Sequence, residues 1–187
     1  GFEQTFERVL VALEDISARR QAEQESKASE AHFRGLFEDS PISLWEEDFS
    51  GVKQVLDALR AAGVTDLENY LNEHPETVEQ CERLIHVLHV NRRTLELFGA
   101  KNENDLLTNL DKVFKAEMRH HFREELLDMW SGKLAYEREG INYSLKGNPI
   151  NVHISWSVLP GHEQTFARAI VALEDITARK KAEEYMK

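Results

Sequence analysis

Histidine and cysteine are the first residues to examine for chemistry, because they bind metals, carry protons and act as nucleophiles. His120 and His121 are adjacent in a predicted helix over residues 115–131, so their side chains point about 100° apart and only one could face a pocket. Their charged surroundings indicate surface histidines. His86 and His89 lie three apart in a predicted strand and face opposite sides. We therefore expect no metal site at either pair.

Cys81 is the only cysteine, which excludes an internal disulfide and favours a reducing compartment. We expect it to be a small buried apolar residue. The sequence has no Ser-His-Asp pattern, no Gly-rich phosphate loop and no kinase phospho-acceptor box. Acidic residues are abundant, but they fall on predicted helix faces, where solvated charge is the default. We therefore predict that the chain is not itself an enzyme.

Composition limits the classes of protein further. The chain has 187 residues, 41% of them hydrophobic, which is enough for one domain with a real core. Its net charge of −11 would repel nucleic acid. No apolar run approaches the roughly 20 residues of a membrane span, so we predict a cytoplasmic segment without membrane contact. We interpret Gly1 as a position inside a longer protein.

One stretch of the chain occurs twice, at an offset of about one domain. Residues 1–24 and 161–184 are identical at 16 of 24 positions. Each copy begins as a β-branched apolar run and continues as a charged, helix-forming run. We interpret the pair as the junction of a tandem array. Residues 1–16 are then the last strand of a preceding repeat.

The remaining elements follow from hydrophobic period and stop signals. A long helix covers residues 17–38 and a strand covers 42–49. Two amphipathic helices are predicted within 51–84, the second broken at His74-Pro75. Asn91 is the expected N-cap of a short helix that ends at Gly99. The other predicted elements are strands over residues 86–90, 136–146, 150–159 and 166–176, and helical segments over residues 92–98, 102–110, 112–114 and 115–131.

Five strands, two early and three late, with helices between them, indicate an α+β fold with an antiparallel sheet. The clearest strand is 150–159. Its residues Ile150, Val152, Ile154, Trp156 and Val158 point one way, and the residues between them point the other way.

The order of these elements resembles a PAS domain of bacterial or archaeal signalling proteins. The matching segments are EAHFRGLFEDSP at 30–41, VNRRTLELFG at 90–99, the late hairpin at 147–156 and EDIT at 174–177. The resemblance implies a five-stranded PAS-like sheet with helices on one face, an inserted helical pair and flanking helices. The implied organisation is a linker or coiled-coil helix over 17–38, a PAS domain over 39–177 with an insertion at 51–84, and the start of a signalling helix over 178–187.

Helical insertions of this size depart from the usual pattern, in which a tight turn joins the first two strands. We favour a packing role for the insertion, in the core or at a dimer contact. Closing one end of a ligand pocket is the alternative. The resemblance also makes haem and flavin the two cofactors to consider. Neither signature is present, since the histidine pair lies in a charged stretch and no Asn-Cys-Arg-Phe motif occurs, so the cofactor is unknown.

Aromatic residues at core positions could line a ligand cavity, although plain packing is their commoner role. If a small ligand is bound, the inward face of 150–158 is the expected wall, and we expect a small apolar or aromatic-containing metabolite. The candidate pocket residues are Trp45, Phe98, Phe122, Tyr143, Ile154 and Trp156.

A second candidate site is the junction between the last strand and the last helix, formed by Glu174, Asp175, Thr177 and Arg179. The resemblance implies that Asp175 holds this junction through a basic partner, for which Arg168 or Arg179 could serve. The alternative for Thr177 is a simple N-cap of the helix that begins at residue 178.

The predicted function is a sensor module that binds a small ligand or a partner and relays a conformational change to an output domain. By resemblance that domain is a histidine kinase, with a diguanylate cyclase next. The expected partners are a second copy, through the flanking helices, and adjacent PAS domains. The competing classes are a ligand-free dimerisation or spacer domain, and a small-molecule enzyme, which would need an acid–base pair in the pocket.

Overall fold

The computed structural model describes residues 17–114 and 118–186, so the strand predicted over 1–16 lies outside the described residues. The chain divides into two units, Gly1–Leu36 and Phe37–Lys187. Helix α1, Ser17–Glu38, has the predicted limits. Two ion pairs between residues four apart stabilise this exposed helix: Lys27 with Glu23 at 2.8 Å and Arg34 with Glu30 at 3.3 Å. No helix in these ranges is long and apolar enough to cross a membrane.

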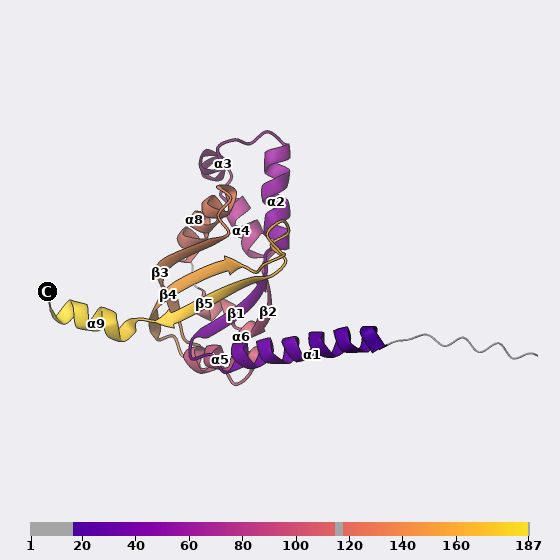
Figure 1. Cartoon of the computed structure of the whole chain (residues 1–187). Coiled ribbons are helices and arrows are strands. Elements are labelled where there is room, and N and C mark those ends of the chain that lie inside the picture. The colour runs from indigo at the N-terminus through magenta and orange to yellow at the C-terminus, as the bar shows by residue number, and fades with distance from the viewer. Residues whose placement is uncertain (1–16, 115–117, 187) are drawn as a thin grey trace, which may run out of the picture. The chain divides into compact units, whose positions relative to one another are not determined.

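The second unit contains a five-stranded antiparallel sheet with the order β2-β1-β5-β4-β3 (Figure 1), which confirms the predicted α+β fold. The strands are β1, Ser43–Asp48; β2, His86–Val90; β3, Ala135–Tyr143; β4, Pro149–Val158; and β5, Ala169–Asp175. Strand β5 is central, between β1 and β4, so a shift in either neighbour bears directly on it.

The helices of this unit occupy the segments predicted for them. The insertion between β1 and β2 has three helices rather than a pair, because the chain breaks at His74–Pro75 as its sequence indicated. The helices are α2, Ser50–Ala61; α3, Leu67–Glu73; α4, Glu76–Glu82; α5, Arg92–Phe98; α6, Glu103–Leu107; α7, Leu110–Val113; α8, Met118–Trp130; and α9, Thr177–Tyr185.

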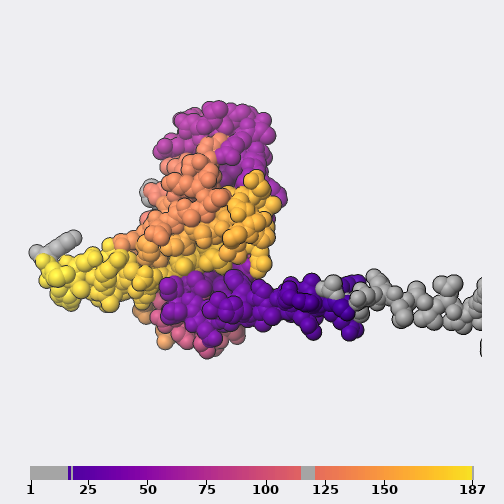
Figure 2. Space-filling view, in the orientation of Figure 1, coloured from indigo at the N-terminus to yellow at the C-terminus, as the bar shows by residue number. Residues whose placement is uncertain are grey.

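Two apolar clusters form the core. One joins the insertion helices to α8 and to Tyr136 and Trp156 of the sheet. The other joins α5, α6 and α7 to Trp45, Ile154 and Leu173. Because both clusters take inward-facing residues of β4, their helices pack on the same face of the sheet, as predicted. Figure 2 shows the insertion and α8 packed together beside the strands.

Asn91 ties the beginning of the domain together. Its side-chain oxygen accepts hydrogen bonds from the backbone N–H groups of Thr94 and Leu44, each at 3.0 Å, and so caps α5 as predicted. Its amide nitrogen donates to the carbonyls of Phe37, at 3.0 Å, and Ile42, at 2.9 Å. Asn91 is fully buried with its polar atoms satisfied, so it fixes α5, β1 and the segment before β1 in one arrangement.

The last strand is shorter than predicted. Strand β5 begins at Ala169, whereas the sequence indicated a strand from Phe166. Phe166 has φ of 55°, in the left-handed region, because the chain turns there: its N–H donates to the carbonyl of His162 at 2.7 Å. Phe166 is nevertheless buried, because its ring packs against Trp156 with centroids 5.8 Å apart.

Candidate ligand cavity and strand–helix junction

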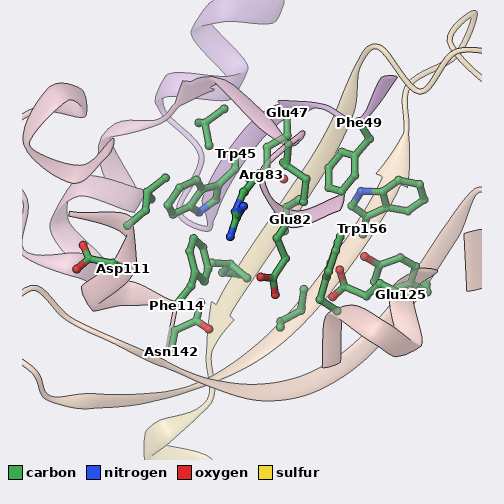
Figure 3. Close-up of a pocket in the computed structure, with 18 residues that line it drawn as sticks. Trp45, Glu47, Phe49, Glu82, Arg83, Asp111, Phe114, Glu125, Asn142 and Trp156 are labelled. Carbon is green, nitrogen blue, oxygen red and sulfur yellow. The ribbon is translucent and has the colours of Figure 1, made fainter. Parts of the chain in front are cut away.

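A cavity of about 420 Å³ lies between the two apolar clusters, bounded by strands of the sheet, by α8 and by the end of α4 (Figure 3). Exposed residues among its lining mark the side on which it meets solvent. The lining residues are Trp45, Glu47, Phe49, Glu82, Arg83, Ile85, Val87, Leu110, Asp111, Phe114, Phe122, Glu125, Tyr136, Asn142, Ile154, Trp156, Val171 and Leu173.

Aromatic rings form much of the cavity wall. Trp156 stacks on Tyr136 with centroids 5.1 Å apart and planes 9° apart. Phe49 meets the same indole edge-on, at 5.5 Å and 79°. At the other side, Trp45 packs against Phe114 at 5.8 Å. Such mutually packed rings hold one another in place, so the wall presents fixed aromatic surfaces.

Four of the six predicted pocket residues line this cavity, namely Trp45, Phe122, Ile154 and Trp156. Phe98 is not among the lining residues; its ring packs edge-on against Trp45, with centroids 5.7 Å apart. Tyr143 is also absent from the lining. The residue before it, Asn142, occupies the inward position of β3, and neighbouring strand residues point to opposite faces.

Two of the four acidic side chains that line the cavity have carboxyl groups with a raised pKa. Glu47 of β1 is buried, and desolvation together with the nearby charge of Glu125 raises its pKa from 4.5 to about 8. Burial raises the pKa of Glu125, on α8, to about 7, partly offset by a hydrogen bond from the Tyr136 hydroxyl and by the Arg138 charge. Arg138 makes its own ion pairs, at 2.6 Å each, with Glu124 and Asp128. The carboxyls are therefore poised to change protonation near neutral pH.

Polar atoms with no partner also line the cavity. Asn142 is fully buried, and neither its amide nitrogen nor its amide oxygen makes a hydrogen bond within the described residues. The Trp156 indole N–H is likewise unpaired in that part of the chain. Buried polar groups are normally satisfied, and leaving one unpaired costs about 1–3 kcal/mol. These atoms are suited to contact a polar molecule inside the cavity.

Sequence reasoning missed Glu47, Glu125 and Asn142, although two signals were available. Glu46 and Glu47 are consecutive in a strand, so one of them must face inward. Glu125 falls in the apolar stripe of its helix, three residues after Phe122 and four before Met129. The expectation that acidic residues lie on solvated helix faces is therefore wrong for Glu125.

The insertion contributes directly to the cavity. Glu82, Arg83 and Ile85, at the end of α4 and in the link to β2, are lining residues. Its remaining apolar residues pack against α8. The insertion therefore both packs in the core and lines the cavity. Figure 3 shows Glu82 reaching toward the middle of the cavity.

The histidine and cysteine positions lie elsewhere. His121 is partly buried and borders a second hollow of about 300 Å³ together with Ile141, Asn151 and Lys180. Cys81 is buried, as expected, and burial raises the pKa of its thiol to about 11. Within residues 17–114 and 118–186, no group of three or more His, Cys, Asp or Glu is arranged to hold a metal ion.

The strand–helix junction is short and directly bonded. One residue, Ile176, separates β5 from α9. The Asp175 carboxylate accepts a hydrogen bond from the Thr177 backbone N–H at 2.9 Å. The Thr177 hydroxyl accepts one from the Asn151 N–H on β4, also at 2.9 Å, so the alternative of a simple N-cap by Thr177 is wrong. These two bonds couple the start of α9 to both β5 and β4.

Neither arginine considered for Asp175 pairs with it. Arg168 forms an ion pair with buried Glu46 on β1, and Arg179 donates to Glu139 on β3 at 2.5 Å. The prediction of a basic partner for Asp175 is therefore wrong. Asp175 holds the junction by accepting a hydrogen bond from the backbone at the start of α9 instead. Glu139 pairs with Lys180 as well, at 2.5 Å, which ties α9 to the edge strand. Glu174, the fourth predicted junction residue, is exposed on β5.

Comparison with known proteins identifies the fold. No protein-family model and no curated protein sequence matches the chain. Among solved structures, a domain of the sensory box sensor histidine kinase/response regulator from Geobacter sulfurreducens aligns with 14% identity and a TM-score of 0.50, over 80% of this chain and 96% of that one.

Two further structures align comparably. The PAS domain of a protein from Colwellia psychrerythraea has 12% identity and a TM-score of 0.50, over 85% of this chain and 99% of that one. The d2 variant of RsLOV has 12% identity and a TM-score of 0.53, over 86% and 73%. Together with the five-stranded antiparallel sheet and its one-sided helices, these alignments show that the chain has the PAS-domain fold.

Proposed function

We propose that this chain is a sensor module that binds a small molecule in the 420 Å³ cavity and relays the change through β5 to α9. One observation carries the proposal: β5 is both a wall of the cavity and the strand that continues into α9. Val171 and Leu173 line the cavity, and α9 begins four residues after Leu173. A ligand that moves these side chains acts on the strand whose end positions the helix.

The bonds at the junction give the relay a physical route. The hydrogen bond between Thr177 and Asp175 moves with β5, whereas the hydrogen bond from the Asn151 N–H to Thr177 is anchored on β4. A displacement of β5 relative to β4 therefore strains the two bonds unequally. Helix α9 then tilts or rotates, since its first turn is held by both strands. Two states separated by a few kcal/mol are sufficient for a ligand to shift their populations.

The output and the assembly follow the expectations from sequence. The module is non-catalytic, and α9 leads to an output domain, a histidine kinase first and a diguanylate cyclase second. The solved domain from Geobacter sulfurreducens belongs to a sensor histidine kinase/response regulator, which favours this order. A parallel homodimer through α1 and α9, in a tandem array of PAS domains in the cytoplasm, carries the rotation to the output.

Native mass spectrometry and thermal shift test the sensor function. The purified protein should carry a bound small molecule, or its melting temperature should rise with some members of a metabolite panel. Ile154→Trp, which fills the cavity, should abolish both effects. His153→Trp is the matched control, because His153 is the preceding residue of β4 and does not line the cavity.

A ligand-free spacer gives the opposite result. The protein would then be empty, no panel member would shift the melting temperature, and Ile154→Trp would affect only stability. The unpaired atoms of Asn142 and the cavity of this size favour the sensor over the spacer.

A further inference from the structure

The charges around the cavity are strongly unequal. Glu47, Glu82, Asp111 and Glu125 supply four acidic side chains, and Arg83 supplies the single basic one among the lining residues. The Arg83 side chain is 79% exposed and its guanidinium pairs with Glu79 at 3.4 Å. Glu47 and Glu125 therefore make the inner part of the cavity acidic, whereas Asp111 and Arg83 are exposed residues at its rim.

Neither Glu47 nor Glu125 has an ion-pair partner among the described residues, although the nearby charge of Arg138 lowers the pKa of Glu125. No basic side chain there forms an ion pair with Glu47, and the Arg138 ion pairs go to Glu124 and Asp128. In the empty cavity Glu47 is therefore kept largely protonated, since a buried carboxylate without a partner is costly. A ligand that brings a positive charge removes that cost.

Other wall groups suit the same kind of ligand. Trp45, Trp156 and Phe49 also line the cavity, and an aromatic ring attracts a cation that meets its face through the ring quadrupole. The unpaired amide oxygen of buried Asn142 accepts a hydrogen bond from an ammonium N–H. Carboxylate, aromatic face and amide oxygen together form the recognition chemistry of an organic ammonium ion with an apolar body.

We propose that the cavity binds a primary or secondary organic ammonium ion with an aromatic or aliphatic body, held by Glu47, Glu125 and the Asn142 amide oxygen against Trp45 and Trp156. This rests on the proposed ligand-sensing function and adds the class of the ligand to it. An anionic ligand is disfavoured by the acidic side chains of the lining, and a neutral one leaves Glu47 protonated and gains no charge–charge attraction.

Proton release is the distinguishing signature of this binding mode. The ammonium ion stabilises the carboxylate form, so a carboxyl that is protonated in the empty cavity loses its proton on binding. The groups facing Glu47 are Glu125 on α8 and Tyr136 on β3; those around Glu125 also include Arg138, Asp128 and Glu124. Glu82 and Arg83 approach from α4. Affinity for the cation should therefore rise with pH between 6 and 8.

Isothermal titration with three probes of one shape tests the inference: phenethylamine, phenethyl alcohol and hydrocinnamate, which are cationic, neutral and anionic at neutral pH. Each titration is run at pH 6, 7 and 8, in two buffers with different enthalpies of ionisation. We expect phenethylamine to bind at least tenfold more tightly than the other two, with release of a fraction of a proton at pH 7. Its affinity should increase at least threefold from pH 6 to pH 8.

Variants separate the carboxyl from its surroundings. Glu47→Gln should weaken phenethylamine binding at least tenfold and remove most of the proton release, without weakening binding of phenethyl alcohol. Glu137→Gln is the matched control, because Glu137 lies on β3 beside Tyr136 but is exposed and does not line the cavity. It should leave all three affinities unchanged.

The outcomes distinguish the two proposals. Equal binding of phenethylamine and phenethyl alcohol, or unchanged amine binding in Glu47→Gln, overturns the ammonium assignment and leaves the sensor function standing. Absence of binding by phenethylamine also overturns the assignment. If, in addition, the protein is empty by native mass spectrometry and no panel metabolite shifts its melting temperature, the sensor function falls as well.

Discussion

Glu47 on β1 and Glu125 on α8 line one cavity from two different elements, and the charge of Glu125 adds to burial in raising the pKa of Glu47. The pair explains how the fold can keep acidic side chains inside a largely aromatic cavity, because protonation replaces ion pairing. It also makes the domain sensitive to pH, with a sign that can be worked out.

Stability should fall as the pH rises from about 4.5 to 8. In the folded state Glu47 keeps its proton up to about pH 8, whereas in the unfolded chain it loses it near its ordinary value of 4.5. The unfolded state binds fewer protons in this window, so Glu47 lowers the free energy of unfolding by up to about 1.4 kcal/mol per pH unit. Above the folded-state pKa of Glu47 the carboxyl is ionised in both states, so this loss of stability grows no further.

Glu47→Gln removes this titration and isolates its effect. Urea unfolding should give nearly equal stabilities for variant and wild type at pH 4.5, and a variant more stable by a few kcal/mol, on the order of 3, at pH 8. Glu184→Gln, an exposed change on α9, should leave the pH profile unchanged. A constant difference between Glu47→Gln and wild type across this range would contradict the assignment.

Asn91→Ala should destabilise the domain by about 2–4 kcal/mol, because it removes bonds to α5, β1 and the segment before β1 and leaves buried partners unpaired. Asn102→Ala is the matched control. Asn102 caps α6 by accepting from the Asp105 N–H at 2.8 Å but is exposed, so its loss should cost only about 1 kcal/mol. Chemical denaturation measures both values, and equal losses would refute the role given to Asn91.

Gly51→Ala tests the packing of the insertion. A Cβ at Gly51 would lie 2.9 Å from the Leu84 Cβ and 3.3 Å from the Leu84 carbonyl oxygen, so α2 must move away from the end of the insertion. We expect a loss of about 1–3 kcal/mol by chemical denaturation, despite the better helix propensity of alanine. A variant as stable as the wild type would show that the two segments separate freely.

Gly35→Ala is the same change without the contact. No atom lies within 4 Å of a Cβ at Gly35, which is a helical position of α1. Only helix propensity then changes. The Gly35→Ala substitution should favour formation of α1 by about 0.5–1 kcal/mol, seen as a higher helix content by circular dichroism.

Glu139→Gln should loosen α9 without changing the stability of the domain. Glu139 is exposed on β3 and pairs with Lys180 and Arg179 of α9, and the hydrogen bond from Lys180 and the charges of both residues lower its pKa. Amide hydrogen exchange in the first turn of α9 should become faster. Glu137 lies two residues earlier on the same face of β3 and contacts His153 instead of α9. Glu137→Gln should therefore leave the amide hydrogen exchange of α9 unchanged. Slower or equal exchange in Glu139→Gln would refute the tether.

The sequence was sufficient for the elements that depend on local rules. Asn91 and Gly99 delimit α5 as cap and stop, and β4 alternates along its whole length as its apolar residues indicated. The limits of β5 were less accessible, because Phe166 is apolar and suited to a strand. Its left-handed conformation depends on a turn closed through His162, which is a tertiary detail.

In the candidate site too, residues set by local sequence pattern were predictable and tertiary pairings were not. Ile154 and Trp156 were predicted because the inward positions of β4 follow from its alternation, and Trp45 because aromatic residues commonly occupy core positions. The pairing of Arg168 with Glu46 and of Arg179 with Glu139 joins residues on different strands and helices. Such partners depend on sheet order and register, which a single sequence does not specify, and this is why the proposed partner of Asp175 was wrong.

The most direct test of the relay is a distance measurement across the junction. Spin labels at Glu137→Cys on β3 and Glu184→Cys on α9 report where the helix lies relative to the sheet, in samples diluted with unlabelled protein. Cys81 should remain unlabelled, because it is buried and its thiol pKa is raised to about 11. Pulsed dipolar spectroscopy is recorded with and without saturating phenethylamine, or with whichever of the three probes binds.

Probe binding should shift the distance distribution in the wild-type background and leave it unchanged in the Ile154→Trp background. Saturating binding in the cavity with the same distribution before and after would contradict the claim that occupancy of the cavity is passed through β5 to α9.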